Sequence, residues 1–118
     1  MQPLDSAPQP AGTSVYGPHS APEITVVLPT YNERDNVPVA IERVGKALAG
    51  RNWEIIVVDD DSPDGTADVV HALSEQDGRV RCIRRIGRRG LSGACVEGMI
   101  AAASPIVAVM DSDLQHDE

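Results

Sequence analysis

The chain has 118 residues, the size of one small domain, so two separate hydrophobic cores are excluded. Its 18 acidic residues outnumber its 10 lysines and arginines, and the formal charge of −8 has the wrong sign for a general nucleic-acid binder. Three aromatic residues, none of them phenylalanine, leave the core to aliphatic side chains and provide no stacking platform for single strands. We therefore expect no nucleic-acid partner.

Residues 1–22 differ in composition from the rest of the chain. They contain five of the nine prolines and few aliphatic residues, which predicts a disordered tail before a domain over residues 23–118. The first residues lack the basic and apolar regions of a secretory signal. The longest apolar run, Met99 to Met110, is shorter than the roughly 20 residues that span a bilayer. The sequence predicts no transmembrane segment and a cytoplasmic protein, at most at the cytoplasmic face of a membrane.

The two cysteines, Cys82 and Cys95, have no metal-ligand spacing and are expected to be reduced, buried thiols.

Apolar runs alternate with helical patterns along the rest of the chain. The predicted strands are 24–28, 53–58, 80–85 and 106–110, and the predicted helices lie between them, the first from Asp35 or Asn36 to Gly50, then 66–76 and 92–103. Thr66 is the expected N-cap of the second helix. Such alternation, with short connections, predicts an α/β fold with a Rossmann-like open parallel sheet and right-handed crossovers.

Polar, mostly acidic segments follow three of the predicted strands. They are PTYNER after the first strand, DDDSPDGT after the second and DSDLQHDE after the fourth. Because the carboxyl ends of parallel strands share one edge of a sheet, these segments are expected to meet there, where open α/β sheets bind ligands. The alternative is that Asp and Gly simply favour turns.

The acids Asp111 and Asp113 are two residues apart, so an extended backbone directs both carboxylates to one side, with Gln115 following them. Their repulsion would be offset by a hard divalent cation such as Mg²⁺, which takes oxygen ligands. A solvated acidic turn is the alternative. In DDDSPDGT, the acid at the end of the second strand could accept hydrogen bonds from a base or ribose. An EF-hand is excluded because the twelfth loop position is His71, not Glu.

The segment GRRGLSG, residues 87–93, is neither a dinucleotide-binding nor a Walker A sequence. Its glycines, which precede a predicted helix, still permit close approach of the backbone to a phosphate. Six of the ten basic residues lie between positions 79 and 89. They indicate either a local patch for anions or lipid headgroups, or a solvated edge strand and loop.

Four segments, in this order and spacing, resemble the family 2 glycosyltransferases of GT-A fold, and within them the dolichol-phosphate or polyprenyl-phosphate mannose synthase branch. They are VVLPTYNERDNVP, EIIVVDDDSPDGT, RRGLSGA and MDSDLQHDE, and they span everything after the tail. The resemblance implies that the chain is the N-terminal, nucleotide-binding half of a GT-A fold with a nucleotide-sugar site. By motif position, Pro29, Tyr31 and Glu33 surround the nucleoside, and Val58 and Asp60 hold base and ribose.

The resemblance also assigns the last motif. Asp111, Ser112, Asp113 and Gln115 correspond to the diphosphate and metal segment, with Ser112 in place of the usual alanine. Asp111, Asp113 and Gln115 would bind Mg²⁺ or Mn²⁺, and Asp113 would be the catalytic residue. The implied reaction transfers a sugar, with GDP-mannose the first choice of donor and UDP-glucose the second, to a polyprenyl or dolichyl phosphate with inversion.

Members of this branch continue beyond the metal motif, so we expect a fragment or shortened reading frame that holds the donor half without the acceptor half. The strand at 106–110 would then be an unprotected sheet edge. The alternative function is a non-catalytic module that binds a nucleotide sugar or a metal. A receiver-like domain is disfavoured because the first strand ends in PTYNE and the one lysine is Lys46, and a sugar nucleotidyltransferase because its glycine-rich first loop is missing.

Overall fold

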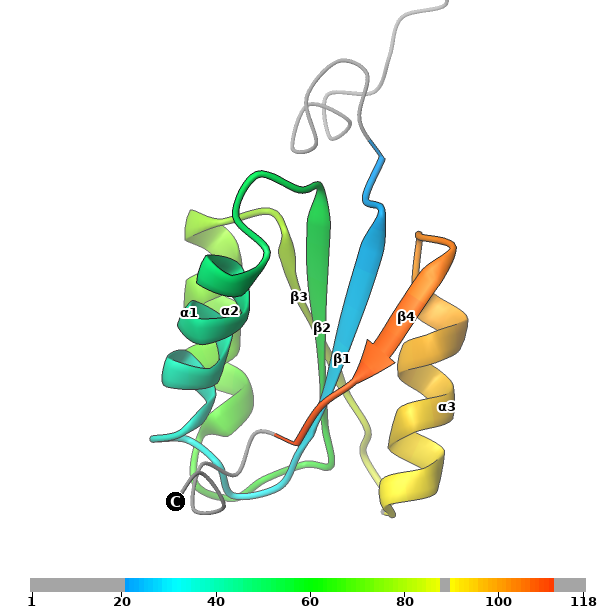
Figure 1. The fold of residues 1–118 in the computed structure, drawn as a ribbon. Coiled ribbons are helices and arrows are strands. Elements are labelled where there is room, and N and C mark those ends of the chain that lie inside the picture. Colours follow the sequence, from blue (N-terminus) through cyan, green and yellow to red (C-terminus); the bar gives the residue numbers. More distant parts are fainter. Residues whose placement is uncertain (1–20, 88–89, 112–118) are drawn as a thin grey trace, which may run out of the picture.

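The computed structural model describes residues 21–87 and 90–111. Its elements, in chain order, are β1 Ile24–Thr30, α1 Val37–Ala47, β2 Trp53–Asp59, α2 Thr66–Gln76, β3 Val80–Arg84, α3 Leu91–Ala101 and β4 Ile106–Val109. The described strands form one parallel sheet (Figure 1), so the predicted open α/β fold is confirmed. Of the predicted tail, only Ala21 and Pro22 are described, and Pro22 is buried.

The described strands lie in the order β3-β2-β1-β4, so the direction of the crossovers reverses after β3. Helices α1 and α2 cover one face of the sheet and α3 covers the other (Figure 1). Right-handed crossovers require this placement, because reversing the direction of travel moves the connecting helix to the opposite face. The reversal creates a switch point at the carboxyl end of β1, which is where sheets of this kind bind ligands.

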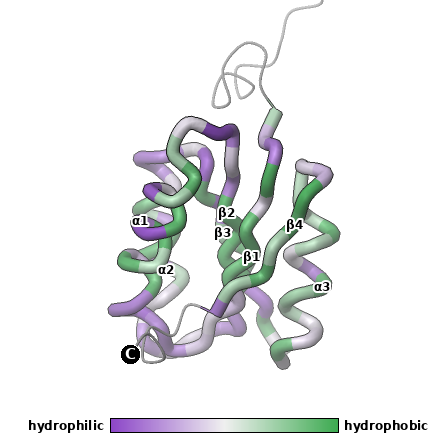
Figure 2. The backbone as a smooth tube through the Cα atoms, in the orientation of Figure 1, coloured by the Kyte–Doolittle hydropathy of each residue, from purple (hydrophilic) through white to green (hydrophobic). Residues whose placement is uncertain are grey.

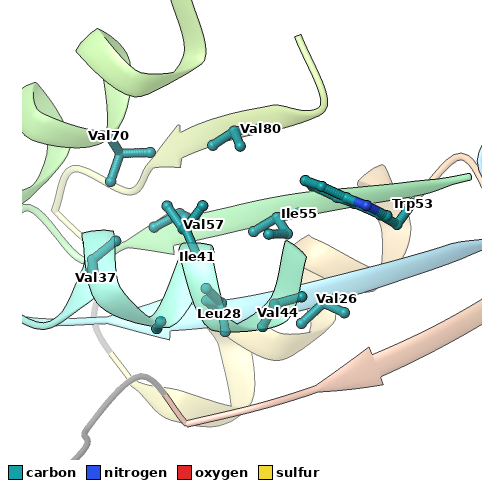
Figure 3. Packing of buried hydrophobic residues seen from close by; sticks show 11 residues of the cluster. Val26, Leu28, Val37, Ile41, Val44, Trp53, Ile55, Val57, Val70 and Val80 are labelled. Carbon is teal, nitrogen blue, oxygen red and sulfur yellow. The ribbon is translucent and has the colours of Figure 1, made fainter. Parts of the chain in front are cut away.

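The core is divided by the sheet into two layers. On one side, α1 packs Val37, Ile41 and Val44 against alternate residues of β1 and β2, among them Leu28 and Val57 (Figure 3). On the other side a smaller cluster packs beneath α3; its buried members are Val27, Ile56, Val58 and Ala94. Because both faces are covered, the middle of each central strand, residues 26–28 and 55–58, is apolar at every position, which explains the continuous hydrophobic runs.

The starts of α1 and α2 agree only in part with the sequence prediction. Asn36 occupies the N-cap position of α1, but among the described residues its side chain donates to the Glu33 carboxylate, at 3.0 Å, rather than capping the helix. Gly65, with a φ of 89°, occupies the N-cap of α2, so Thr66 lies inside the helix. The Asp64 carboxylate accepts the Thr66 N–H at 3.0 Å, so it is Asp64 that provides a side-chain acceptor at the start of α2. The predicted N-cap position of α1 is therefore confirmed at Asn36, although its side chain makes no capping bond, and the predicted N-cap of α2 at Thr66 was wrong.

Strand β1 also continues past Pro29, where the sequence predicted its end. Val27 accepts a backbone bond from Met110 on the β4 side, and Thr30 accepts one from Asp60 on the β2 side. The backbone of Pro29 therefore faces the β4 side, and pairing with β4 ends at Val27. Proline is tolerated here because no ladder partner requires its missing N–H.

Helix α3 crosses the sheet very closely at Gly98. A β-carbon on Gly98 would lie 2.4 Å from Val27 Cγ1, a separation that packed carbon atoms do not reach. The apolar helix buries only Ala94 and Gly98 fully among its described side chains, and Leu91 and Ile100 are exposed. The close approach of the helix backbone to β1 is thus one of the contacts that fix α3 on the sheet.

We expect Gly98→Ala to lower the free energy of unfolding by roughly 1–2 kcal/mol, because the cost of overpacking exceeds the gain in helix propensity. Urea unfolding measures this loss. In the double variant with Val27→Ala, the loss should be smaller than the sum of the two single losses. Additive losses would show that the close crossing does not constrain the helix.

Polar residues gather along the carboxyl edge of the sheet, at the bottom of Figure 2, while the strands are largely apolar.

The two cysteines, Cys82 and Cys95, are free and half-buried, less buried than the sequence suggested. Burial and, secondarily, the Asp59 charge raise the pKa of the Cys82 thiol to about 11, so it is neutral at pH 7 and a poor nucleophile. None of the helices in the described ranges has the length and apolar character needed to cross a bilayer.

Candidate functional site

A cavity of about 210 Å³ lies at the carboxyl edge, where the ends of β1 and β2 meet the start of α3. Its lining residues are Pro29, Thr30, Tyr31, Asp60, Gly90, Leu91 and Ala94. Three elements therefore contribute to one wall, on the α3 face of the sheet. The position agrees with the switch point created by the strand order.

The loops after β1 and β2 are fastened to each other by backbone donors. Asn32 N–H donates to Ser62 Oγ at 2.8 Å, and Glu33 N–H donates to Thr66 Oγ1 at 3.1 Å. A third bond joins Arg34 N–H to the Asp64 carboxylate at 3.2 Å. These bonds hold the segment after Tyr31 rigidly against the start of α2, so the cavity wall is formed before any ligand binds.

The first acid of the DDD triplet has a structural role. Asp59 is completely buried, and its Oδ1 accepts bonds from the hydroxyls of Thr30, at 2.8 Å, and Ser62, at 2.6 Å. Its Oδ2 accepts the backbone N–H of Ser62 at 2.9 Å. The carboxylate thus ties the end of β1 to the loop after β2, and its hydrogen-bonding capacity is used within the protein.

The third acid of the triplet is directed elsewhere. Asp61 has a φ of 58°, a left-handed conformation that Asp tolerates better than most residues, and it forms an ion pair of 2.7 Å with Arg84. Both side chains are substantially exposed. Asp60 is therefore the acid of the three that lines the cavity.

Asp60 is only 6% exposed, and its Oδ2 accepts the backbone N–H of Gly90 at 2.8 Å. Gly90 has a φ of 137°, a conformation that L-residues avoid, which explains a glycine at this position. The other oxygen, Oδ1, makes no hydrogen bond with any of the residues that the structure describes. That oxygen is itself buried and lies 3.4 Å from Arg85 Nε. Asp60 thus combines an internal ion pair with a place in the cavity wall, where a carboxylate is suited to accept a hydrogen bond from a ligand.

Four of the six residues of the basic cluster lie within the described part of the chain, and Arg88 and Arg89 lie outside it. Of its described members, Arg79 pairs with an acid at 3.0 Å, as does Arg81, and Arg84 pairs with Asp61. Arg85 is 4% exposed and lies near the Asp60 and Glu97 carboxylates. The interpretation as a solvated loop is therefore wrong for Arg85, and these four arginines are engaged by acids of the same chain.

The structure brings some of the predicted nucleotide residues together. Pro29, Tyr31 and Asp60 line the same cavity. Glu33 is adjacent and half-buried, with its carboxylate bound by the Asn36 amide. Val58 lies in the core with its side chain fully buried beneath α3, so its side chain does not line the cavity. Its role in holding the base stays a prediction.

Asp111 follows β4 at the same edge of the sheet but lines another cavity, of about 410 Å³, which is mostly apolar and lies between α1 and the strands β1 and β4. The other members of the predicted metal and diphosphate segment lie outside the described residues; they are Ser112, Asp113 and Gln115. Within residues 21–87 and 90–111, no group of three or more His, Cys, Asp or Glu side chains is placed to hold a metal. Of the predicted metal ligands, Asp111 is the one that lies within the described residues.

Several residues of the site were not found from the sequence as site residues. Gly90, Leu91 and Ala94 line the cavity from the start of α3, and Arg85 supports it from the end of β3. The glycines of residues 87–93 were the available signal, because they mark a backbone that passes close to other groups. Nothing in the local sequence separated Arg85 from its basic neighbours.

Comparison with known proteins agrees with this geometry. Residues 25–118 match the family described as glycosyl transferase family 2. The chain belongs to this family. The predicted family resemblance is confirmed.

Curated relatives of this family 2 chain include the dolichol-phosphate mannosyltransferase of Pyrococcus furiosus, 46% identical over 94 residues, which are 80% of this chain and 26% of that protein. Another is the dolichol-phosphate mannosyltransferase of Mycosarcoma maydis, 38% identical over 111 residues, 89% of this chain and 38% of that protein. The chain thus spans about a quarter to two fifths of their length.

Among solved structures, the mannosyltransferase PcManGT from Pyrobaculum calidifontis, in complex with GDP-Man and Mn²⁺, superposes with a TM-score of 0.68 at 27% identity. The match covers 80% of this chain and 28% of that one. The family 2 chain therefore has the nucleotide-binding side of a GT-A fold, as predicted.

Proposed function

We propose that this family 2 chain is the donor-binding half of a glycosyltransferase that transfers mannose from GDP-mannose to a polyprenyl or dolichyl phosphate, with inversion. The observation that carries the proposal is Asp60, a buried carboxylate in the wall of a preformed cavity. Its place at the switch point of the sheet is where this fold binds nucleotides. The relatives named as dolichol-phosphate mannosyltransferases support the choice of sugar and acceptor.

The cavity supplies groups suited to the nucleoside end of a donor. The Asp60 carboxylate can accept a hydrogen bond from a base or ribose, and the Tyr31 side chain at the mouth of the cavity can pack against a planar ring. The N-terminus of α3 borders the same cavity, and its positive end favours an anionic group. Pro29 and Glu33 complete the predicted nucleoside contacts.

We infer that Asp111, Asp113 and Gln115 would hold Mg²⁺ or Mn²⁺, because carboxylate and amide oxygens are the ligands that these hard cations take. Asp111 lies at the carboxyl edge shared with the cavity. A bound cation would supply positive charge to the diphosphate. Ser112 belongs to the same segment and would lie beside the diphosphate.

The proposed transfer requires little acid–base chemistry from the protein. An oxygen of the acceptor phosphate attacks the anomeric carbon as the bond from that carbon to the GDP oxygen breaks, and GDP leaves with the bonding electrons. Because a phosphate is already anionic at neutral pH, no strong general base is needed. The residues of this chain would bind the donor and orient its anomeric carbon. Such positioning lowers the entropic part of the barrier, because the donor no longer has to find the reactive geometry by free diffusion.

The lipid phosphate acceptor places the reaction beside a membrane, which supports peripheral contact at a cytoplasmic membrane face. The alternative, a non-catalytic module that binds a nucleotide sugar, shares the donor site and differs only in lacking transfer. Radiolabelled mannose transfer to a short polyprenyl phosphate in detergent tests for the enzyme. Transfer supports the enzyme and excludes the module, whereas binding of GDP-mannose without transfer is expected both of the module and of a donor half that lacks its acceptor half.

Titration calorimetry tests the donor site directly. We expect GDP-mannose to bind more tightly than UDP-glucose, and both to lose affinity at least about tenfold when EDTA replaces Mn²⁺, because charge-assisted bonds to the diphosphate are lost. Asp113→Ala and Asp111→Asn should show the same loss with Mn²⁺ present. Equal heats with and without the metal, or in the wild type and both variants, would count against the proposal.

A further inference from the structure

Arg85 is a buried cation that the proposed donor site does not use directly. Its backbone N–H donates to Asp59 O at 2.8 Å, which fixes it beside the end of β2. Its side chain is 5% exposed, and its Nε lies 3.4 Å from Asp60 Oδ1 and 3.6 Å from a Glu97 carboxylate oxygen. Its Nη1 donates to Gly90 O at 3.3 Å. The guanidinium therefore lies against the Asp60 carboxylate, the Glu97 carboxylate and the Gly90 carbonyl.

Gly93 makes room for this guanidinium. A β-carbon on Gly93 would lie 2.8 Å and 2.9 Å from the two terminal nitrogens of Arg85, and 3.2 Å from its Cζ. Gly93 stands inside α3, where glycine is otherwise unfavourable relative to alanine. Glycine is found at position 93 because the Arg85 guanidinium occupies the space that a side chain would need.

We propose that Arg85 is a positioning residue for the nucleotide: it holds the Asp60 carboxylate and the Gly90 backbone in one arrangement, and Gly93 is the cradle that permits it. The identity of the ligand rests on the proposed function, but the arrangement itself does not. Gly90 N–H donates to Asp60 and Gly90 O accepts from Arg85, so the three groups form a closed ring of contacts.

The charges explain why a cation is needed at this point. A buried carboxylate and a polyanionic nucleotide beside it would repel each other. Arg85 compensates the charge of Asp60 without occupying the cavity, since Arg85 is not among the lining residues. Glu97, four residues after Gly93 on α3, lies 3.6 Å from the same Arg85 Nε.

The test compares three variants of the full chain by GDP titration in the presence of Mn²⁺. Gly93→Ala retains every charge but displaces the guanidinium, Arg85→Gln removes the charge, and Arg85→Lys restores a charge with one donor group. We expect about tenfold weaker GDP binding in Gly93→Ala and in Arg85→Gln, and partial recovery in Arg85→Lys. Ser92→Ala, on the same turn of α3, and Arg84→Gln, at an exposed ion pair, are the matched controls and should bind as the wild type does.

Two further measurements separate positioning from a purely structural role. Circular dichroism should show that Gly93→Ala is folded at the temperature of the titration, because the helix propensity gained with alanine offsets part of the cost of moving the Arg85 guanidinium, so a loss of affinity would not come from unfolding. The Gly90 amide resonance should shift in Gly93→Ala without any ligand, and stay in place in Ser92→Ala. Wild-type affinity in Gly93→Ala or Arg85→Gln, or an unmoved Gly90 resonance in Gly93→Ala, would overturn the inference. If the wild-type chain fails to bind GDP, the proposed function falls and the Gly90 resonance alone decides whether Arg85 sets this arrangement.

Discussion

Replacing Glu54 by alanine is expected to lower the free energy of unfolding by roughly 3 kcal/mol, a large part of the stability of so small a domain. Glu54 is fully buried in β2, where its carboxylate accepts bonds from Thr25 Oγ1 at 2.6 Å and from Ala103 N–H at 2.8 Å. The buried Thr25 hydroxyl and the Ala103 N–H both lose this acceptor in the variant. The third partner, Arg81, donates at 3.0 Å, but its side chain is 41% exposed and can turn to water, so it adds little to the cost.

Urea unfolding followed by circular dichroism measures this effect. Glu42→Ala is the matched control, because the Glu42 pair with Lys46 is exposed on α1 and should contribute less than about 0.5 kcal/mol. The network of Glu54 joins β1 and β2 to the connection between α3 and β4, and so supports β4, which leads to Asp111. Equal losses in the two variants would show that the buried network is not a principal source of stability.

The same carboxylate predicts a pH dependence. Burial raises the pKa of Glu54, but the bonds from Thr25 and Ala103 and the charge of Arg81 outweigh it, so the pKa lies below its ordinary value of 4.5. A group whose pKa is lower in the folded state stabilises the protein above its unfolded pKa, and this stabilisation is lost as the pH falls through the folded value. Between pH 5 and pH 3 the wild type should therefore lose stability more steeply than Glu54→Gln. Parallel pH profiles would contradict the assignment.

Asp60→Asn is expected to weaken GDP binding by about 30-fold, equivalent to roughly 2 kcal/mol, because the substitution removes a charged acceptor and places a donor in its position. The amide keeps the shape of the side chain, so the cavity itself should remain. The amide nitrogen of the asparagine, itself a donor, must then face another donor, either the Gly90 N–H or the Arg85 guanidinium. The loss therefore includes both the ligand bond and the mismatch within the site.

Asp61→Asn is the matched control, one residue further along the loop. Asp61 pairs with Arg84 at the surface and does not line the cavity, so GDP affinity should stay within about twofold of the wild type. Isothermal titration calorimetry of both variants with GDP and Mn²⁺ makes the comparison. Equal affinities of the two variants would remove Asp60 from the proposed site.

Local rules were sufficient for the elements that bury continuous apolar runs. The β2 strand and α2 were predicted to within a residue because every side chain of β2 is buried, and the helical spacing around Val70 has no competing interpretation. The ends of the elements were harder to predict. Asn36 and Thr66 have the composition of caps, but their side chains bond with Glu33 and Asp64, which are placed by contacts between two loops.

The sequence by itself determined the parallel sheet, the family and the meeting of the loops after β1 and β2, because hydrophobic period and strand direction are properties of short segments. Only the tertiary structure decided which of the three adjacent acids lines the cavity, and that Arg85 is buried behind it. Those outcomes depend on the left-handed turn at Asp61 and on the space left by Gly93, which is more than 30 residues from the three acids. A side chain's direction in a loop is set by such distant partners, and for that reason neighbouring residues of identical chemistry acquired different roles.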